Sequence, residues 1–266
     1  MRYTKSIRLL KLEIYDSFMN MALDEAILTA RAADKAPDTL RLYQWQPSTV
    51  SIGRNQNAAN EVYLENCRKL GVSVVRRVSG GGTVFHNSNG EITYSLIASA
   101  TNLNAKDGMA IYAKIYSGIK DALRILGITA DYSVGDEKNC PNLTVKGKKI
   151  SGSAQTRKCD VILQHGTLLL DVDLEKMFTL IRVPWAKTLT QVVNVAEKRI
   201  TSVKQELGHS VSTETAANAL VTGFKNALSM QLIESELTTF EKALAKKICK
   251  ERYTTSKWNV GAKSKI

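Results

Sequence analysis

Cysteine, histidine and proline are scarce in this chain. Its 266 residues include four cysteines, three histidines and four prolines. No two cysteines form a CxxC pair, and no two histidines or cysteines have the spacing of zinc ligands, so we expect neither a disulfide framework nor a metal site built by the protein. No apolar run is long enough to span a bilayer and no signal peptide is visible, which predicts a cytoplasmic protein with reduced thiols and no membrane partner.

The two common nucleotide-binding motifs are also missing. No GxxxxGK[ST] segment occurs, which excludes a Walker P-loop. No GxGxxG segment follows a strand to open a helix, which excludes a Rossmann fingerprint. A nucleotide or another anion would therefore need a site of a different kind.

The segment Arg76–Asn87, RRVSGGGTVFHN, predicts such a site. Gly80–Gly82 have no Cβ, so they can adopt positive φ and let a phosphate or carboxylate approach their N–H groups closely. Arg76 and Arg77 add guanidinium donors that suit anionic oxygens. The alternative is a glycine-rich hairpin that carries two solvated arginines.

A second polar segment follows at Leu143–Gln155. Apolar residues flank a turn at Lys146–Gly147, which predicts a hairpin whose returning strand begins near Lys149. The small residues Ser151–Ala154 leave room for a ligand beside that lysine, whose ammonium would stabilise a developing negative charge. The neighbouring lysines of the turn are interpreted as solvated.

The formal net charge of +12 allows two kinds of partner. A basic protein can bind nucleic acid, but here the lysines are scattered and no basic stripe alternates with aromatic residues. A basic surface also speeds encounters with an acidic protein. The motifs favour an acidic protein partner over nucleic acid.

Four ordered motifs resemble the lipoate-protein ligase A family, which belongs to a wider group with biotin ligases and octanoyltransferases. They are Thr49–Asn57, Val74–His86, Gly147–Ala154 and His165–Leu170, and the ending Tyr253–Asn259 is similar to the end of that family's catalytic domain. The resemblance implies a single lipoate-ligase-like catalytic domain over 1–266. Its part from about 174 to 266 is expected to be helical, with no large accessory C-terminal domain.

The resemblance implies a two-step ligase reaction. Lipoate and ATP, with Mg²⁺, would give lipoyl-AMP, and a lysine of an acidic lipoyl-domain protein such as a 2-oxoacid dehydrogenase E2 or the glycine cleavage H protein would take the lipoyl group. Lys149 is the implied catalytic residue. The residues implied to bind the nucleotide or lipoyl-AMP are Arg76, Arg77, Gly80, Gly81, Gly82, Thr83, Val84, His86 and Lys149.

The alternative is an ATP-independent octanoyl or lipoyl transferase that forms an acyl-enzyme on a cysteine. Glu91–Ser95 looks more like the octanoyltransferase branch, whereas Gly53–Asn57 and the triple glycine look more like the ligase branch. Cys140 lies in a polar loop before Lys149 and is the candidate nucleophile, although its spacing is not the one expected for the transferase. The ligase is therefore the main interpretation, working with a separate accessory subunit.

Asn142 stands where the family commonly has an acidic residue, so no magnesium ligand is assigned. Cys67 and Cys249 lie in amphipathic helical patterns and are interpreted as structural. His165 begins an apolar strand and is interpreted as a hydrogen-bonded core residue. His86 is expected to contact the ligand or to make a structural hydrogen bond.

Strands with interspersed helices predict an α+β fold, a mixed, largely antiparallel sheet flanked by helices. The predicted strands are 7–14, 39–45, 50–52, 72–77, 83–85, 91–97, 143–145, 149–154 and 161–170. The predicted helices are 20–31, 62–70, 110–126, 214–228 and 237–252.

Overall fold

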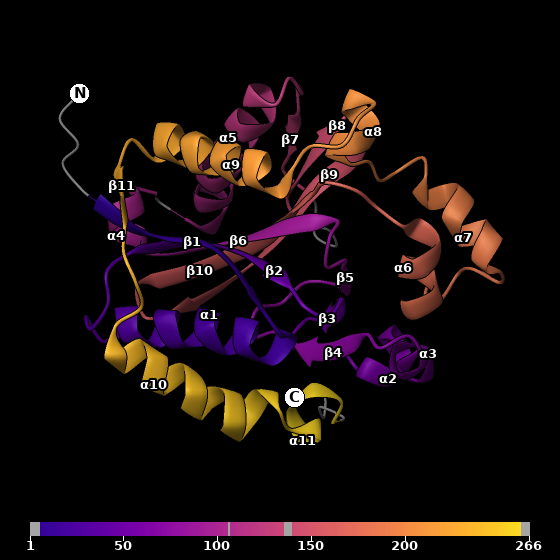
Figure 1. Ribbon diagram of the computed structural model, residues 1–266, viewed down its shortest axis with the longest axis horizontal. Coiled ribbons are helices and arrows are strands. Elements are labelled where there is room, and N and C mark those ends of the chain that lie inside the picture. Colours follow the sequence, from indigo (N-terminus) through magenta and orange to yellow (C-terminus); the bar gives the residue numbers. More distant parts are fainter. Residues whose placement is uncertain (1–5, 106, 136–139, 262–266) are drawn as a thin grey trace.

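A computed structural model describes residues 6–105, 107–135 and 140–261 (Figure 1). Its centre is an eight-stranded sheet in the order β11-β1-β2-β6-β10-β9-β8-β7. The strands are β1 (Ser6–Tyr15), β2 (Thr39–Trp45), β6 (Glu91–Ser99), β7 (Asp131–Ser133), β8 (Asn142–Val145), β9 (Lys148–Lys158), β10 (Val161–Leu169) and β11 (Gln231–Glu234).

The pairing of the strands is mixed. β1 pairs in parallel with β2 and β11, whereas the pairs from β2 through β6, β10, β9 and β8 to β7 are antiparallel. At the β8–β9 hairpin, Lys146 and Gly147 have φ of 49° and 79°, the left-handed backbone that a two-residue hairpin turn requires. The predicted α+β fold with a mixed, largely antiparallel sheet is confirmed.

Helices cover both faces of this sheet. In Figure 1, α5 (Gly108–Ile125) and α9 (Thr213–Leu228) lie on one face, and α1 (Ser17–Ala32) and α10 (Thr239–Ile248) lie on the other. α5 and α9 pack closely because they meet at glycines, where a Cβ on Gly223 would lie 2.2 Å from the Gly118 carbonyl oxygen. A salt bridge from Arg8 on β1 to Glu241 ties α10 to the sheet.

A smaller sheet in the order β4-β3-β5 carries the glycine segment. Its strands are β3 (Thr49–Ile52), β4 (Ser73–Arg76) and β5 (Val84–His86). β4 and β5 do not pair with each other, because β3 lies between them. The glycine loop therefore crosses the end of β3 instead of closing a hairpin.

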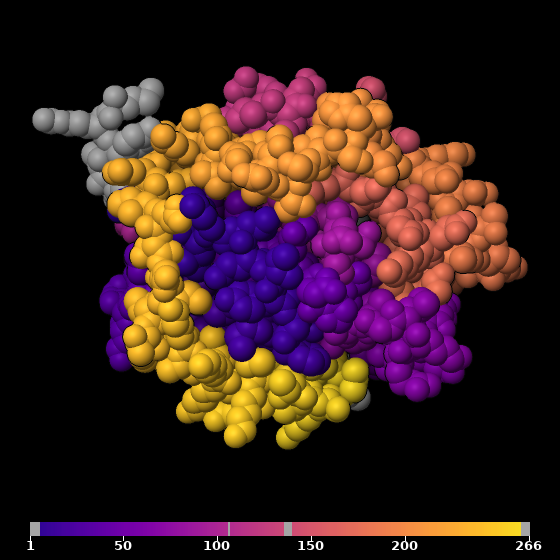
Figure 2. Space-filling view, viewed as in Figure 1, coloured from indigo at the N-terminus to yellow at the C-terminus, as the bar shows by residue number. Residues whose placement is uncertain are grey.

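The remaining described elements are short. They are α2 (Ala58–Glu61), α3 (Leu64–Lys69), α4 (Ala100–Leu103), α6 (Leu174–Leu180), α7 (Leu189–Ala196), α8 (Val203–Leu207), the π-helix η1 (Cys249–Tyr253) and α11 (Ser256–Asn259). In the space-filling view, the segment with α6 and α7 projects at the right, and the C-terminal segment covers the lower edge beside α1 (Figure 2). No helix in the described ranges has the length and hydropathy to cross a membrane.

The sequence patterns missed two strands, β7 and β11. Both are short, and most residues of β11 are exposed, so they carry no apolar alternation. The predicted helix 237–252 is α10 continued by η1, and the strand predicted over 149–154 extends to Lys158.

Candidate active site

A cavity of about 530 Å³ lies where the small sheet meets β9 and β10. Of the residues predicted for the site, those that line this cavity are Arg77, Gly81, Gly82, Thr83, Val84, His86, Cys140 and Lys149. The fold thus gathers the glycine segment, the cysteine loop and the β8–β9 hairpin around one space, although the chain separates them by about sixty residues.

Much of the cavity lining is apolar or aromatic. These residues are Met21, Tyr43, Trp45, Val84, Phe85, Leu169, Met177, Ile181 and Ile200. The ring of Trp45 stacks on that of His86, with centroids 4.1 Å apart and planes at 20°. A pocket with an apolar wall and a few polar groups suits an acyl chain that ends in a carbonyl group.

Two of the residues predicted for the site, Cys140 and Lys149, lie on this cavity. Cys140 is exposed and next to Pro141, which also lines the cavity. Two backbone hydrogen bonds hold Lys149 in place. Its N–H donates to Arg199 O at 2.7 Å, and its carbonyl oxygen accepts from the Thr201 N–H at 2.9 Å.

The side chain of Lys149 occupies the space that a side chain on Gly152 would need. A Cβ at that glycine would lie 2.4 Å from Lys149 Cε and 2.6 Å from Nζ. The Lys149 residue is exposed through the open cavity, yet burial among the surrounding protein atoms lowers its pKa, while Cys140 acts in the opposite direction. A lysine of this kind exchanges protons more readily near neutral pH than a fully solvated one.

The side chain of Arg77 holds the glycine loop through hydrogen bonds to its carbonyl groups. Its Nη2 donates to Gly80 O and Gly82 O at 2.9 Å each, and its Nη1 donates to Ser51 O at 3.0 Å and to Ser51 Oγ at 2.8 Å. Burial lowers the pKa of Arg77 to about 10, so the guanidinium is charged at neutral pH. Gly81 has φ of 85°, and Gly53 must be glycine because a Cβ there would lie 2.1 Å from Gly81 O.

Two serine–histidine–carboxylate chains start from Arg77. In the first, Ser51 Oγ lies 2.7 Å from His86 Nε2, and His86 Nδ1 lies 2.6 Å from Glu91 Oε1. Because a carboxylate only accepts, His86 donates to Glu91 through Nδ1, and in this tautomer its Nε2 accepts from the Ser51 hydroxyl.

The second chain runs from Ser79 through His165 to Asp24. Ser79 Oγ lies 2.6 Å from His165 Nε2, and His165 Nδ1 lies 2.9 Å from Asp24 Oδ2. All three residues are buried, and Ser79 does not line the cavity. We therefore assign this chain to holding the loop and not to nucleophilic attack.

Electrostatics keeps His165 neutral in the folded protein. Burial lowers the pKa of His165 and the charge of Arg77 adds to this, which together outweigh its carboxylate partner. Burial acts to raise the pKa of Asp24, but hydrogen bonding to His165 and the charge of Arg41 lower it overall. Asp24 is already paired with Arg41 at 3.1 Å, so it does not need a protonated histidine.

Arg76 lies outside the lining of the cavity. Its side chain is fully buried and donates to the backbone carbonyls of residues 53, 54, 56 and 258, at distances from 2.5 to 3.2 Å. Neither Arg76 nor Gly80 lines the cavity. A direct contact of these two residues with a ligand stays a prediction, whereas the observed role of Arg76 is to fasten β4 to the segment after β3 and to the C-terminal segment.

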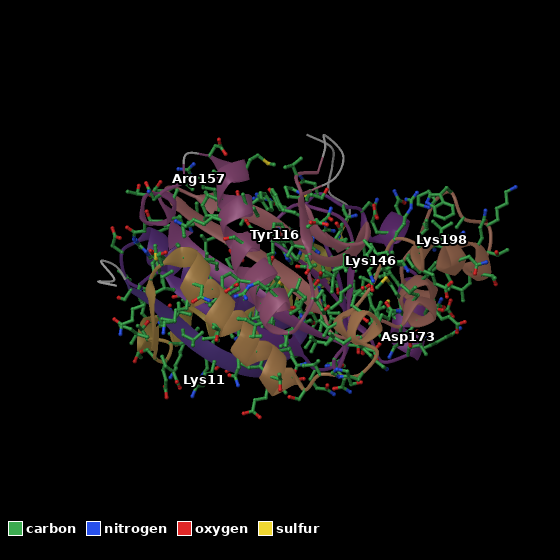
Figure 3. All side chains as sticks on the ribbon, turned by 90° about the horizontal axis from the view of Figure 1, so that it is seen from above. Lys11, Tyr116, Lys146, Arg157, Asp173 and Lys198 are labelled. Atoms are coloured by element: carbon green, nitrogen blue, oxygen red, sulfur yellow. The ribbon has the colours of Figure 1, made fainter. Side chains whose placement is uncertain are left out.

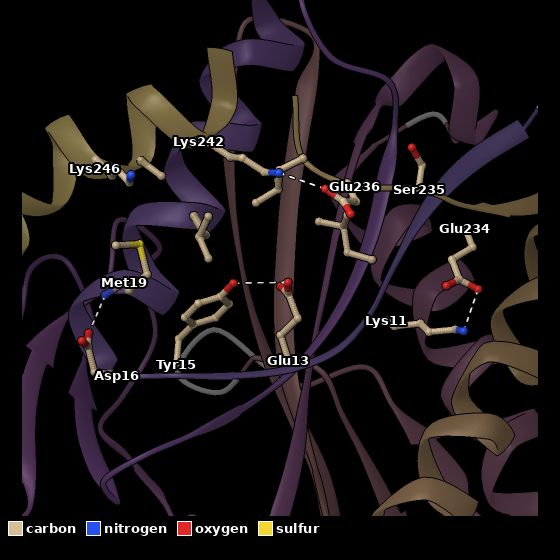
Figure 4. A pocket seen from close by; sticks show the side chains of 14 residues that line it. Lys11, Glu13, Tyr15, Asp16, Met19, Glu234, Ser235, Glu236, Lys242 and Lys246 are labelled. Atoms are coloured by element: carbon tan, nitrogen blue, oxygen red, sulfur yellow. Dashed lines mark hydrogen bonds and ion pairs between the residues drawn. The ribbon is translucent and has the colours of Figure 1, made fainter. Parts of the chain in front are cut away.

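A larger groove, of about 640 Å³, runs between β1, α1 and α10 (Figure 4). Charges of both signs line it and pair with one another: Lys11 with Glu234 at 2.8 Å and Lys242 with Glu236 at 2.9 Å. The Tyr15 hydroxyl donates to Glu13 at 3.3 Å. The groove has no cysteine, histidine or glycine-rich loop among its lining residues, so the smaller cavity is the better candidate for chemistry.

Sequence reasoning missed several residues around the cavity. Asp24, Ser51, Ser79 and Glu91 belong to hydrogen-bonded chains that only the fold assembles. His165 is the buried, hydrogen-bonded residue that we expected, and it also lines the cavity. Within the described ranges no group of three histidine, cysteine or acidic side chains is placed to hold a metal ion.

Curated relatives of this chain are octanoyltransferases. It is 35% identical to octanoyltransferase LipM of Brevibacillus brevis, over 91% of this chain and 94% of that one, and 36% identical to octanoyltransferase LipM of Kyrpidia tusciae, over 90% and 93%. The prediction of an ATP-dependent lipoate-protein ligase is therefore wrong. The motifs misled because they indicate the family without separating its ligases from octanoyltransferases.

The chain is also similar to solved structures of lipoate protein ligases. A bipartite lipoate protein ligase from Thermoplasma acidophilum superposes with a TM-score of 0.83 at 28% identity, covering 98% of both chains. A lipoate-protein ligase A bound with ATP gives 0.84 at 27% identity, covering 96% and 99%. The model of the lipoyl protein ligase A/B catalytic domain matches residues 16–225. This protein belongs to the lipoyl protein ligase A/B catalytic-domain family.

Proposed function

We propose that this protein is an octanoyltransferase that moves an octanoyl group from the thioester of a carrier protein to the acceptor lysine of a lipoyl domain. Cys140 carries the acyl group between the two. The observation that supports this function most is the exposed thiol of Cys140 in the same cavity as Lys149, beside an apolar wall. The octanoyltransferase relatives support the donor and the reaction class.

The first half of the reaction acylates the enzyme. Cys140 Sγ forms a bond to the acyl carbonyl carbon, the bond from that carbon to the carrier sulfur breaks, and the Cys140 thiol proton leaves on the carrier thiol. In the second half, the amine of the acceptor lysine forms an amide with the acyl carbon and the bond to Sγ breaks. A proton of the amine returns to Cys140, so the enzyme is restored.

Lys149 is proposed to take the Cys140 proton and to hand it on in each half-reaction. Its lowered pKa favours this exchange, and its ammonium form stabilises both the thiolate and the negative charge on the acyl oxygen. The backbone of Gly81–Val84, held by Arg77, is proposed to face the reacting carbonyl group, and His86 to contact the acyl chain next to Trp45.

A thioester donor makes ATP and Mg²⁺ unnecessary, because a thioester is already activated for attack by an amine. The acyl-acceptor partners would be lipoyl-domain proteins, and the positive charge of the enzyme would attract their acidic surfaces. An E2 lipoyl domain accompanies the Thermoplasma ligase, which supports this class of acceptor.

Intact-mass spectrometry tests this proposal. Enzyme incubated with octanoyl-carrier protein and no ATP should gain one octanoyl group, and an apo lipoyl domain added next should take it. Cys140→Ser should remove both products, while Cys159→Ser, a change at a second exposed cysteine outside the cavity, should behave as the wild type. Transfer by Cys140→Ser, or transfer that requires ATP, would refute the proposal.

A further inference from the structure

We propose that Tyr112 and Tyr116 of α5 are positioning residues that hold Cys140 at the cavity for acyl transfer. This inference rests on the proposed function, since it concerns the geometry of that nucleophile. The two tyrosines are one helical turn apart, with ring centroids 6.4 Å apart and planes at 20°, so both project from the same face of α5.

Tyr116 fixes the backbone next to the cysteine. Its hydroxyl donates to Pro141 O at 2.9 Å and accepts from Ser153 Oγ at 2.8 Å. The residue is buried, and Figure 3 places it in the central part of the molecule. Tyr116 and Pro141 are both buried, so breaking this bond would cost the free energy of a buried hydrogen bond, and the loop at Cys140 is held at Pro141.

The hydrogen bond to Pro141 is the last of four successive hydrogen bonds in which each acceptor residue is the donor of the next. Gln155 Nε2 donates to Gln164 Oε1 at 3.0 Å, and Gln164 Nε2 donates to Ser153 Oγ at 3.2 Å. Ser153 then donates to Tyr116, which donates to the loop. The series begins on β9 and β10, which pair with each other without a register shift. The position of the cysteine loop therefore depends on a regular part of the sheet.

Tyr112 lies beside Tyr116 on the same helix and is an electrostatic neighbour of the Cys140 side chain. The Cys140 side chain is a hydrogen-bonding and charge partner of the Tyr112 hydroxyl, and after burial it is the cause that raises the pKa of Tyr112 most. A phenol that keeps its proton at neutral pH donates to a thiolate. Cys140 thus has the ammonium of Lys149 and the hydroxyl of Tyr112 as its stabilising neighbours.

Tyr132 provides a matched control. Its ring packs on that of Tyr116 with centroids 5.6 Å apart, and no described group hydrogen-bonds its buried hydroxyl oxygen. Tyr132→Phe therefore removes the same atom from the same cluster without removing a contact to the cysteine loop.

The experiment compares Tyr112→Phe, Tyr116→Phe and Tyr132→Phe in a Cys159→Ser background. The first measurement is the rate of Cys140 alkylation by iodoacetamide as a function of pH, which needs no acyl substrate. Tyr112→Phe should shift this profile to higher pH and slow alkylation at neutral pH about tenfold, because the thiolate loses a donor. Tyr132→Phe should leave the profile unchanged.

The second measurement is the rate at which octanoyl-carrier protein acylates Cys140. Tyr116→Phe should lower it about tenfold while the alkylation profile keeps its midpoint, because the loop is displaced and the thiol keeps its neighbours. If Tyr112→Phe and Tyr116→Phe match Tyr132→Phe in both measurements, the inference is wrong.

A parallel assay of Cys140→Ser separates this inference from the proposed function. Transfer by Cys140→Ser would refute the octanoyltransferase mechanism and the positioning role with it. An inactive Cys140→Ser together with fully active tyrosine variants would refute the positioning role alone.

Discussion

Lys149 shows how one glycine can determine the place of a charged group. Its side chain lies across Gly152, with Cε and Nζ in the volume that a Cβ would fill. Hydrogen bonds to Arg199 and Thr201 fix the backbone of Lys149, so the root of its side chain has a defined place beside the cavity. The ammonium therefore reaches the cavity that Cys140 also lines, and burial there lowers its pKa.

Gly152→Ala should lower the rate of acyl transfer by about tenfold to a hundredfold, because a displacement of about 1 Å near the reacting atoms has that effect. The unfolding midpoint should change little, since the displaced atoms are the end of a flexible side chain. Steady-state rates of Gly152→Ala, Lys149→Ala and the double variant provide the measurement. A further loss from Gly152→Ala in the Lys149→Ala background would show that the glycine acts in another way.

The glycine loop is an element whose shape depends on one buried arginine. β4 and β5 both pair with β3, so the loop between them must cross the end of β3 close to Gly53. Arg77 bonds two carbonyl groups of the loop and also Ser51 on β3. A lysine has one nitrogen and cannot make these bonds in the same geometry.

Arg77→Lys should therefore reduce the free energy of unfolding by at least about 2 kcal/mol, because buried acceptors lose charged donors. It should also reduce acyl transfer more than tenfold by loosening the loop. Denaturant unfolding gives the first value and the octanoyl assay the second. Arg157→Lys, at an exposed pair with Asp160, should change stability by less than about 0.5 kcal/mol. Equal effects of the two changes would contradict this role of Arg77.

The Asp24–His165 pair connects parts of the whole molecule. Asp24 lies on α1, His165 on β10 and Ser79 in the glycine loop, and Arg41 and Tyr43 of β2 complete the cluster. The cluster is buried at the point where the helix layer, the large sheet and the small sheet meet. Its protonation state should therefore affect global stability.

The folded pKa of His165 lies below its ordinary value of 6.5, so the unfolded chain binds the proton first as pH falls. The free energy of unfolding should decline below about pH 6.5, by up to about 1.4 kcal/mol per pH unit for this group, until the folded histidine also protonates. Asp24 adds a second loss only below its ordinary value of 3.8.

Denaturant unfolding between pH 5 and 8 provides the measurement. His165→Asn should flatten the decline below pH 6.5, whatever its effect at pH 8, whereas His209→Asn, at an exposed histidine, should retain it. An unchanged slope in His165→Asn would show that this histidine does not titrate as proposed.

Much of the fold can be predicted from local patterns. The strand at 39–45 and the hairpin at Lys146–Gly147 occur where alternation and turn residues place them, and helix 110–126 differs from α5 only at its ends. These features depend on the pleat of a strand, the turn of a helix and the freedom of glycine, which act over a few residues. The choice between ligase and transferase failed because the motifs that carry the resemblance indicate the family and not the branch.

The sequence alone identifies the candidate site groups: an arginine–glycine segment, a lysine beside small residues and a cysteine in a polar loop. Tertiary structure decides which of these meet. It turns Arg76 toward backbone carbonyls and Arg77 toward the loop, and it joins Pro141, the residue after Cys140, to the Tyr116 hydroxyl of α5. The reason is physical: local patterns report neighbours along the chain, whereas a buried donor is satisfied by whatever acceptor the packing of distant elements provides.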